Sequence, residues 1–441
     1  MASIPAPGIR DGAPAGDTAA ARPMLALFAL ALTMAIGFTA MTSFATVQEA
    51  AKAELTLSDY GLSLIQGLSA AIPLALFSIP IGILVDRTRR VRLMLALAAL
   101  WTVGTLLTAL AASATILFLA RMMVGIGTTG ALTAALSLAA DFCRPDQRGR
   151  ALLIVSVGKM LGTAAAFAVT GALYGLFVHG TIAPIGTLSA WRASHVALAA
   201  IALVLIVPVA LLREPQRREV ASSIHAPARR VIAELWQRRA FLIPLFVGQV
   251  SVVMADAAAN IWAAPVRSRS YGLKPEQFSG WMGAVLLGAG IGGAVLGGLA
   301  ADWGQRSGRR GGLLYGAILA AALGVPTAAF PLMPGVTGFA VAFGLLMLCG
   351  TVTGLITSVS LTVFMPNELR GLCIGAFIAF AGIIGFGIAP TLVAAIGDAM
   401  GGGAKIGEAL AIVGVLVGIA SVAAFALAAR RAPGSAASEP V

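Results

Sequence analysis

Apolar runs separated by short polar segments fill most of the chain. A helix that crosses the hydrocarbon core of a bilayer needs about 20 mostly apolar residues. Runs of about that length are residues 23–47, 60–84, 91–111, 115–139, 151–177, 195–212, 241–264, 278–301, 312–332, 336–364, 372–396 and 406–429. The pattern predicts an all-α membrane protein with twelve transmembrane helices.

The longest polar interruption, residues 213–240, separates the first six runs from the last six and is rich in arginine and glutamate. We interpret it as a cytoplasmic linker between two six-helix bundles, residues 23–212 and 241–429. A patch that binds lipid headgroups is the alternative interpretation. Residues 1–22 and 430–441 are predicted to be cytoplasmic tails, and the first, rich in Ala, Gly and Pro, is predicted to be disordered.

Charge content supports a membrane location and indicates an orientation. Hydrophobic residues make up 59% of the 441 and charged residues only 11%, whereas about a quarter of a soluble domain is charged. A net charge of +12 would suggest nucleic acid as the partner of a soluble protein. Most of the Lys and Arg, however, fall on one side of the predicted topology, which places both termini in the cytoplasm. We expect a monomer in the plasma membrane, with no nucleic-acid partner, and the Ala- and Gly-rich composition suggests a bacterial inner membrane.

Two loop sequences occur once in each half. Gly82 and Asp86 precede several arginines, and Gly298 and Asp302 do so again. The segment 145–149 (Pro-Asp-Gln-Arg-Gly) has a counterpart at 366–371 (Pro-Asn-Glu-Leu-Arg-Gly), at nearly the same offset. Two loops repeated at nearly one offset indicate two homologous halves.

The first loop resembles the loop between helices 2 and 3 of major facilitator superfamily transporters. The residues that carry the resemblance are Gly82, Leu84, Asp86, Arg87 and Arg90. The resemblance implies two pseudo-symmetric six-helix bundles, secondary active transport, and a gating role for Gly82, Asp86, Arg87, Arg90, Asp302 and Arg309. Arg89 replaces the usual glycine, and the second copy has about three extra residues before Gly308. Asp86 also suits a place near a helix N-terminus, where the helix dipole favours an anion.

Within that superfamily, residues 50–155 are most similar to the spinster-like group. The similar segments are Leu57-Ser-Asp59, Asp86 to Leu93, and Leu119 to Gly127. Members of that group usually carry an acidic residue where Thr128 and Thr129 stand here, and an Asp-Arg pair where Ala40 and Met41 stand. The resemblance therefore does not imply export of lipids or sugars coupled through those acids.

Three ionisable side chains fall deep within the apolar runs: Arg121, Lys159 and Asp256. An ionisable group at the bilayer centre is costly and usually faces a cavity or a partner. At about 1.5 Å of rise per residue, Lys159 and Asp256 lie at similar depth in different halves. The candidate substrate- or proton-binding residues are Lys159, Asp256, Arg121, Gln249, Asn260, Thr163, Thr39, Thr42 and Ser43.

Two interpretations of the charges remain open. Lys159 and Asp256 form a structural ion pair that holds one conformation, or Lys159 binds an anion while Asp256 carries a proton. Burial favours a neutral carboxyl group, and a nearby lysine favours the ionised one. Arg121 either lines the cavity or extends toward the outer interface. The threonines and serines are explained equally well by contacts between helices.

We therefore expect a secondary active transporter of a small organic solute, an organic anion, that works by alternating access and draws on a proton gradient. Alternatives are an exporter of lipid-like or drug-like amphiphiles and a transporter-like membrane sensor that signals through residues 213–240. An enzyme is not expected, because His179, His195 and His225 lie near run ends or in the linker, away from Asp256.

Neither a cofactor nor a metal is expected. Two glycine patterns, at residues 125–130 and 288–293, mimic a dinucleotide fingerprint, but both lie inside apolar runs instead of after a strand. Glycines four residues apart, as in 288–297, more often allow close approach of helices. The cysteines Cys143, Cys349 and Cys373 are too widely spaced to indicate a disulfide framework or a metal pair.

Overall fold

The structure is a computed structural model that describes residues 23–143, 147–183, 185–215, 236–365, 373 and 376–433. Several predictions lie outside these ranges. They concern the N-terminal tail, most of the linker with His225, the loop residues 145, 146 and 366–371, and the last residues of the C-terminal tail.

The described residues contain twelve helices that are long and apolar enough to cross a membrane, which confirms the predicted fold class. The first six are α1 (Pro23–Glu54), α2 (Asp59–Ile72) continued by η1 (Pro73–Phe77) and α3 (Ser78–Arg87), α4 (Arg90–Leu110), α5 (Ala114–Phe142), α6 (Arg148–Val178), and α7 (Ala190–Leu205) with α8 (Val207–Ala210). The other six are α10 (Arg239–Tyr271), α11 (Pro275–Arg306), η3 (Gly312–Leu314) with α12 (Tyr315–Thr327) and η4 (Phe330–Leu332), α13 (Gly335–Phe364), η5 (Ala381–Ile388) with α15 (Ala389–Ala399), and η6 (Gly403–Lys405) with α16 (Ile406–Arg431).

Several helices run one or two turns beyond the apolar runs that predicted them. α1 continues to Glu54 where the apolar run ends at residue 47, and α10 continues to Tyr271 where the run ends at 264. An apolar run reports only the part of a helix in hydrocarbon, whereas the backbone hydrogen bonds continue into the interface. These extra turns carry charged side chains that become important below.

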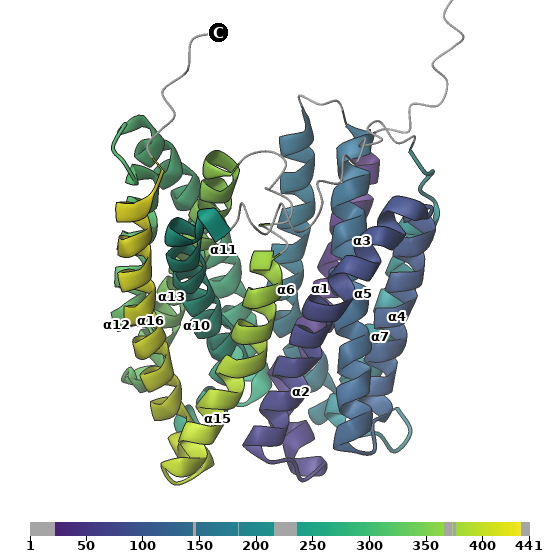
Figure 1. Ribbon diagram of the computed structural model, residues 1–441. Helices are drawn as coiled ribbons and strands as arrows, with labels where there is room; N and C mark the ends of the chain where they lie inside the picture. Colours follow the sequence, from purple (N-terminus) through teal and green to yellow (C-terminus); the bar gives the residue numbers. More distant parts are fainter. Residues whose placement is uncertain are drawn as a thin grey trace, which may run out of the picture.

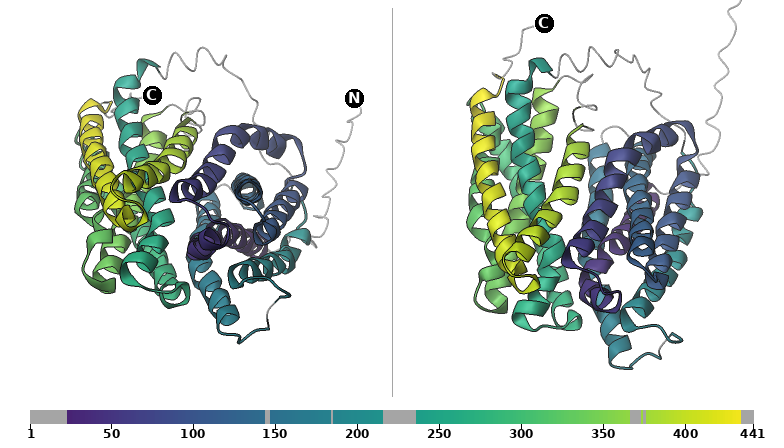
Figure 2. Two further views of the ribbon diagram at one scale, coloured as in Figure 1. Left: turned by 90° about the horizontal axis from the view of Figure 1, so that it is seen from below. Right: turned by 60° about the horizontal axis from the view of Figure 1, so that its bottom comes forward.

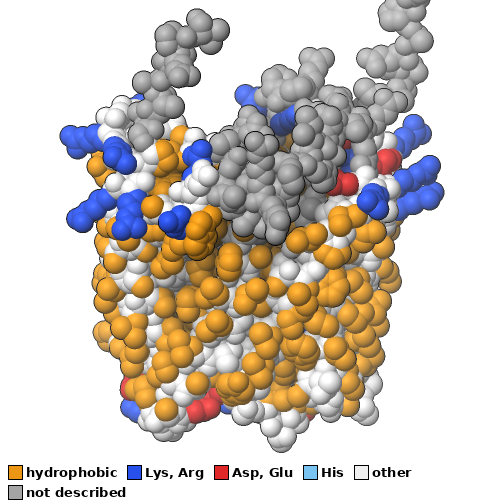
Figure 3. Space-filling view, in the orientation of Figure 1, with side chains coloured by type: hydrophobic (Ala, Val, Ile, Leu, Met, Phe, Trp, Pro, Cys, Tyr) orange, Lys and Arg blue, Asp and Glu red, His pale blue; other side chains and the backbone are white. Residues whose placement is uncertain are grey.

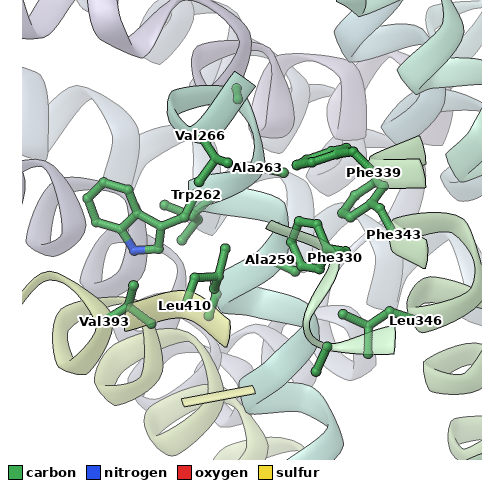
Figure 4. Packing of buried hydrophobic residues seen from close by; sticks show 14 of the residues in the cluster. Ala259, Trp262, Ala263, Val266, Phe330, Phe339, Phe343, Leu346, Val393 and Leu410 are labelled. Carbon is green, nitrogen blue, oxygen red and sulfur yellow. The ribbon is translucent and has the colours of Figure 1, made fainter. Parts of the chain in front are cut away.

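The two halves lie side by side, each an up-and-down bundle of helices (Figures 1 and 2). In Figure 2 the purple-to-blue first half lies beside the green-to-yellow second half. Glycines let helices approach within each half: a Cβ at Gly158 would collide with the backbone of Ala31 in α1. In the second half, Trp262 and the rings of Phe330, Phe339 and Phe343 form a buried core (Figure 4).

Lysine and arginine gather at one end of the molecule. The space-filling view shows most blue side chains in a band above the orange belt and few at the bottom (Figure 3). We call the upper end, which includes Arg87–Arg92 and Arg306–Arg310, the arginine-rich end. The other end, which includes the α1–α2 and α10–α11 connections, is called the opposite end.

The halves touch near the opposite end and in the middle, along α6 and α11. A Cβ at Gly171 or Gly283 would meet Ser279 or Ala164 across the interface. The last such contact toward the arginine-rich end joins Met160 to Gly290.

Beyond that contact the two helices part. Leu153, two turns before Met160 and on the same face of α6, is 60% exposed. Span 2 and η5 are also in contact across the interface: Gly67 of α2 lies against the Phe386 carbonyl group, and Leu74 of η1 lies against Gly382. The interface is therefore closed at the opposite end and open toward the arginine-rich end.

Both spans of this second contact contain a stretch of π-helix. η1 follows α2, and η5 precedes α15, and the two stretches lie next to each other across the interface. In a π-helical turn the backbone hydrogen bonds join residues five apart instead of four, and such turns are frequent at functional sites. Pro73, at the start of η1, removes one backbone donor and accounts for the local change in span 2.

Candidate functional site

A cavity of about 90 Å³ lies between the two halves. The first half contributes side chains of α1, α2 and α5, and the second half contributes side chains of α10 and η5. The residues that line it are Met41, Thr42, Ala45, Gln66, Ser69, Ala70, Arg121, Gly125, Ala257, Asn260, Ile261 and Phe386. The wall is mainly apolar, with a few convergent polar groups, as is usual for a small-molecule site.

Arg121 supplies the positive charge of this cavity. Its guanidinium group donates to the Ala40 carbonyl oxygen at 3.0 Å and to that of Met41, and it lies 5.6 Å from the Phe44 ring centroid. The residue is buried, its Nε has no partner, and it forms no ion pair with a described carboxylate. The alternative that Arg121 extends to the outer interface is wrong for this conformation, because its donors are held by the backbone of α1.

Asn260 faces the same cavity from the second half. Its amide group donates to the Asp256 carbonyl oxygen at 2.8 Å and contacts the Met347 sulfur, while Oδ1 has no partner. The cavity thus has a cationic donor on one wall and an uncommitted amide oxygen on the other.

Two glutamines connect the halves beside this cavity, and sequence reasoning missed both. Gln66 donates to Gln48, and Gln48 in turn donates to the Ile261 carbonyl oxygen at 2.6 Å across the interface. Gln48 follows the predicted first run directly, and Gln66 lies within the second. Gln249 and Asn260 were candidates because they lie at helical spacing from the charge of Asp256, whereas the first two apolar runs contain no such charge to single out Gln48 and Gln66.

Asp256 lies one helical turn from Asn260, where α10 meets α13. Its carboxylate group is so close to Gly350 that a Cβ at that glycine would collide with it, and Oδ1 is buried without a partner. The predicted neighbour Gln249 faces α13 as well, where its Oε1 accepts from Thr357 at 3.1 Å. Asp256 therefore sits beside the cavity, in the seam between two helices of the second half.

Lys159 does not meet Asp256 in this conformation. Its Nζ lies 5.2 Å from the Phe38 ring centroid, and no ion pair with Asp256 is present in the part of the chain that the structure describes. Its neighbours in α6 pack on both sides, Gly158 against α1 and Met160 against α11. Lys159 therefore lies between these two contacts, on the same face of α6 as Ser156 and Thr163.

The three candidate residues of α1, Thr39, Thr42 and Ser43, lie in different surroundings. Only Thr42 lines the central cavity. Thr39 donates to the carbonyl oxygens of Ala35 and Gly162, and Ser43 faces the buried His195 at 3.5 Å. On α6, Thr163 donates to the Lys159 carbonyl oxygen. These hydroxyl groups serve contacts within and between helices, in line with the alternative that the sequence left open.

A charge cluster closes the opposite end, and sequence reasoning did not find it. Arg269 of α10 donates to Glu49 at 2.7 Å and to Asp59 at 2.6 Å, both in the first half, and Lys52 reaches Asp59 at 2.5 Å. The Arg269 guanidinium group also donates to the Gly403 carbonyl oxygen. The cluster, called here the outer lock, joins Glu49, Lys52, Asp59 and Arg269 and couples the halves directly.

Known proteins show which family has this architecture. The model of the major facilitator superfamily matches residues 26–390. The chain belongs to the major facilitator superfamily. A search of curated proteins found no match.

Among solved structures, the superfamily member is similar to a bacterial homologue of the human lysosomal transporter Spinster, in its inward-facing and unoccupied conformation. The identity is 22% over 96% of this chain and 100% of that one, with a TM-score of 0.80. The inward-facing and occupied conformation gives a TM-score of 0.69, at 22% identity over 92% and 95%. A point mutant of the nucleoside transporter NupG gives 0.71, at 10% identity over 91% and 99%. At these identities the likeness shows the fold.

The first of the two predicted gating loops of this superfamily member is held by a buried arginine. Arg90 pairs with Asp141 at the end of α5 and with Glu214 at 3.1 Å, beyond the sixth span. Glu214 also accepts from the backbone N–H of Arg90, the first residue of α4. The carboxylates that complete the loop lie far away in sequence, which is why the motif alone did not reveal them.

The other residues of the predicted gating loops are exposed or lie in open space. Asp86 lies in the last turn of α3, and the chain remains helical through Arg87 and turns only before α4 begins at Arg90. Nothing lies within 4 Å of a Cβ built at Gly82. In the second copy, Asp302 and Arg309 are exposed at the arginine-rich end.

Proposed function

We propose that this superfamily member is a secondary active transporter of a small organic anion. The observation that carries the proposal is Arg121, a buried cation that lines a cavity between the halves and has no carboxylate partner among the described residues. A buried charge without a partner is costly, so an anionic substrate that pairs with Arg121 recovers part of that cost. Asn260 and Gln66 supply further hydrogen-bonding groups.

Proton coupling is the second part of the proposal, and Asp256 is its candidate. The carboxyl group lies beside the cavity with one oxygen buried and unpartnered, so it can change protonation state without breaking an ion pair. Lys159 is proposed as a second cationic contact for the substrate, along the path from the arginine-rich end.

Orientation and mechanism follow from the distribution of charge. We infer that the arginine-rich end is cytoplasmic, by the positive-inside rule, and that both termini are cytoplasmic in a plasma-membrane monomer of bacterial type. The open arginine-rich end then makes this conformation inward-facing, like the conformation of the spinster homologue to which the chain is similar. Alternating access requires the outer lock to separate while the arginine-rich end closes.

An exporter of amphiphiles is the second candidate. It is favoured by the mainly apolar wall of the cavity, with Met41, Ala45, Ile261 and Phe386. A neutral amphiphile would leave Arg121 without a counter-charge, and for that reason we place the organic anion first. The sensor alternative depends on the linker, most of which lies outside the described residues.

A thermal-shift screen tests the substrate class. Purified protein is heated with small carboxylates and organic phosphates, each beside its neutral amide or alcohol analogue, and hits are retested for uptake into proteoliposomes with and without a proton gradient. The proposal predicts that anions stabilise the protein and their neutral analogues do not, because ligand binding stabilises the folded state by mass action. Stabilisation by neutral amphiphiles alone would favour the second candidate.

A further inference from the structure

We propose that a second pocket, at the arginine-rich end of the second half, binds the phosphate-bearing headgroup of an anionic phospholipid. The pocket has a volume of about 480 Å³ and lies apart from the central cavity. Its described lining residues are Arg238, Gly304, Gln305, Gly308, Arg309, Arg310, Gly311, Gly312, Leu313, Val363, Phe364 and Pro433. None of them is acidic.

The three arginines of this pocket keep most of their donors available. Arg238 donates one N–H to the Phe364 carbonyl oxygen at 3.3 Å, and Arg310 donates one to the Ala432 carbonyl oxygen at 2.7 Å. The Arg309 side chain makes no hydrogen bond or ion pair with the described residues. A guanidinium group has five N–H donors in a fork that matches phosphate oxygens. The pocket therefore presents positive charge without a resident counter-ion among those residues.

The backbone holds the arginines in place. Gly308 and Gly311 have φ angles of 63° and 71°, in the left-handed region that favours glycine. Gly311 also packs so tightly on the Ala429 backbone that a side chain could not fit there. Arg309 and Arg310 thus project from a tight turn that α16 supports, which makes the pocket a defined site instead of a mobile tail.

The position of the pocket favours a lipid over a soluble anion. Trp303 precedes the lining residue Gly304, and Trp236 lies two residues before Arg238, and both indole rings are exposed. Exposed tryptophans gather at the headgroup level of a bilayer. Val363, which is also exposed, and Phe364 line the same pocket. Arginines beside apolar side chains at that depth fit a phosphate group with an attached acyl chain.

Native mass spectrometry on the purified full-length protein tests this inference. The protein is mixed with equal amounts of phosphatidylglycerol and phosphatidylcholine, and the lipid that it retains is counted. The pocket variant carries Arg238→Gln, Arg309→Gln and Arg310→Gln. The control variant carries Arg306→Gln, Arg430→Gln and Arg431→Gln, which remove the same charge from exposed positions at the same end but outside the pocket. A monodisperse elution profile without added lipid verifies that each variant is folded, and Arg309→Gln alone replaces the triple variant if that one does not fold.

The proposal predicts that the wild type prefers phosphatidylglycerol and that the control variant keeps this preference. The pocket variant should bind phosphatidylglycerol about tenfold or more weakly. Arg309→Gln alone should show a clear part of that loss. Glycerol 3-phosphate at millimolar concentration serves as the soluble-anion arm and is expected not to displace the lipid. Equal retention of both lipids, an unchanged preference in the pocket variant, or displacement by glycerol 3-phosphate would overturn the proposal.

Discussion

Arg121 is the residue on which the substrate proposal depends most. Replacing it with Gln removes the charge but leaves a polar group of similar length. Because a hydrogen bond to a charged group contributes about 1.5–3 kcal/mol, we expect Arg121→Gln to raise the KM for an anionic substrate about tenfold or more. Uptake into proteoliposomes measures the effect, with monodispersity as the test of folding.

The matched substitution is Arg121→Lys, which keeps the charge and loses the planar fork that donates to Ala40 and Met41. It should retain part of the affinity for the anion. A KM for Arg121→Gln equal to that of the wild type would remove Arg121 from the substrate site.

Asp256 separates proton coupling from substrate binding. A carboxyl group can take up and release a proton and an amide cannot, so Asp256→Asn should abolish proton-driven accumulation. Counterflow exchange should remain, because exchange requires no net release of protons. Both activities are measured in the same proteoliposome preparation, with and without a proton gradient. Undiminished accumulation by the variant would eliminate Asp256 as the proton carrier.

Lys159 and Asp256 were obvious in the sequence because charges are rare in apolar runs, yet their relation was not. The structure keeps them apart, with Lys159 beside Phe38 and Asp256 against Gly350. The outer lock was equally hidden, because Glu49 and Arg269 lie at helix ends where charges are ordinary. Which side chains meet across the interface depends on how the two bundles are placed relative to each other. A single sequence does not specify that placement.

Helices were the easier part of the prediction. Apolar length alone identified the spans, since a bilayer permits few alternatives to a helix. It did not reveal the π-helical stretches η1 and η5, because a π-turn has no clear signal in apolar periodicity. The glycine spacing of α11 was interpreted correctly for Gly293 and Gly297, which pack on α13, but Gly288 has nothing within 4 Å.

That difference within one helix supplies a stability prediction. A Cβ at Gly293 would lie 2.6 Å from the Thr351 Cβ and 2.9 Å from the Leu348 carbonyl oxygen. Because overpacking costs about 1–3 kcal/mol, Gly293→Ala should lower the thermal stability of the purified protein. Gly288→Ala, five residues earlier in the same helix, is the control and should leave it unchanged or raise it. Equal behaviour of the two variants would contradict the helix packing described for α11.

At the scale of the whole molecule, the outer lock should favour the conformation described here. Arg269→Gln removes its only contribution from the second half, while Lys52 still pairs with Asp59. We therefore expect the population to shift toward the outward-open state with little loss of stability. In cells, a Ser69→Cys reporter in the central cavity should react faster with an impermeant thiol reagent added from outside.

Arg192→Gln is the matched control for that experiment. Arg192 pairs with Glu54 at 2.6 Å, but both lie in the first half, so this ion pair does not join the halves. Labelling of the reporter should not change in this variant. An equal rise in both variants would mean that loosening of the fold, and not release of the lock, exposes the cavity.

Relative movement of the halves is the central claim, and a disulfide between them tests it most directly. Ala71 of α2 and Gly387 of η5 face each other across the interface, with 3.5 Å between the Cβ of Ala71 and a Cβ built at Gly387, within the range that a disulfide bridges. The variant carries Ala71→Cys and Gly387→Cys with Cys143, Cys349 and Cys373 replaced by Ala. The control, Gly324→Cys with native Cys349, joins α12 to α13 within one half, at 4.0 Å.

Counterflow of the substrate from the screen is measured in proteoliposomes after oxidation and again after reduction. Alternating access predicts that oxidation stops exchange in the variant that joins the halves, that reduction restores it, and that the control transports in both states. Full exchange by the oxidised inter-half variant, with the disulfide verified by mass spectrometry, would contradict the account.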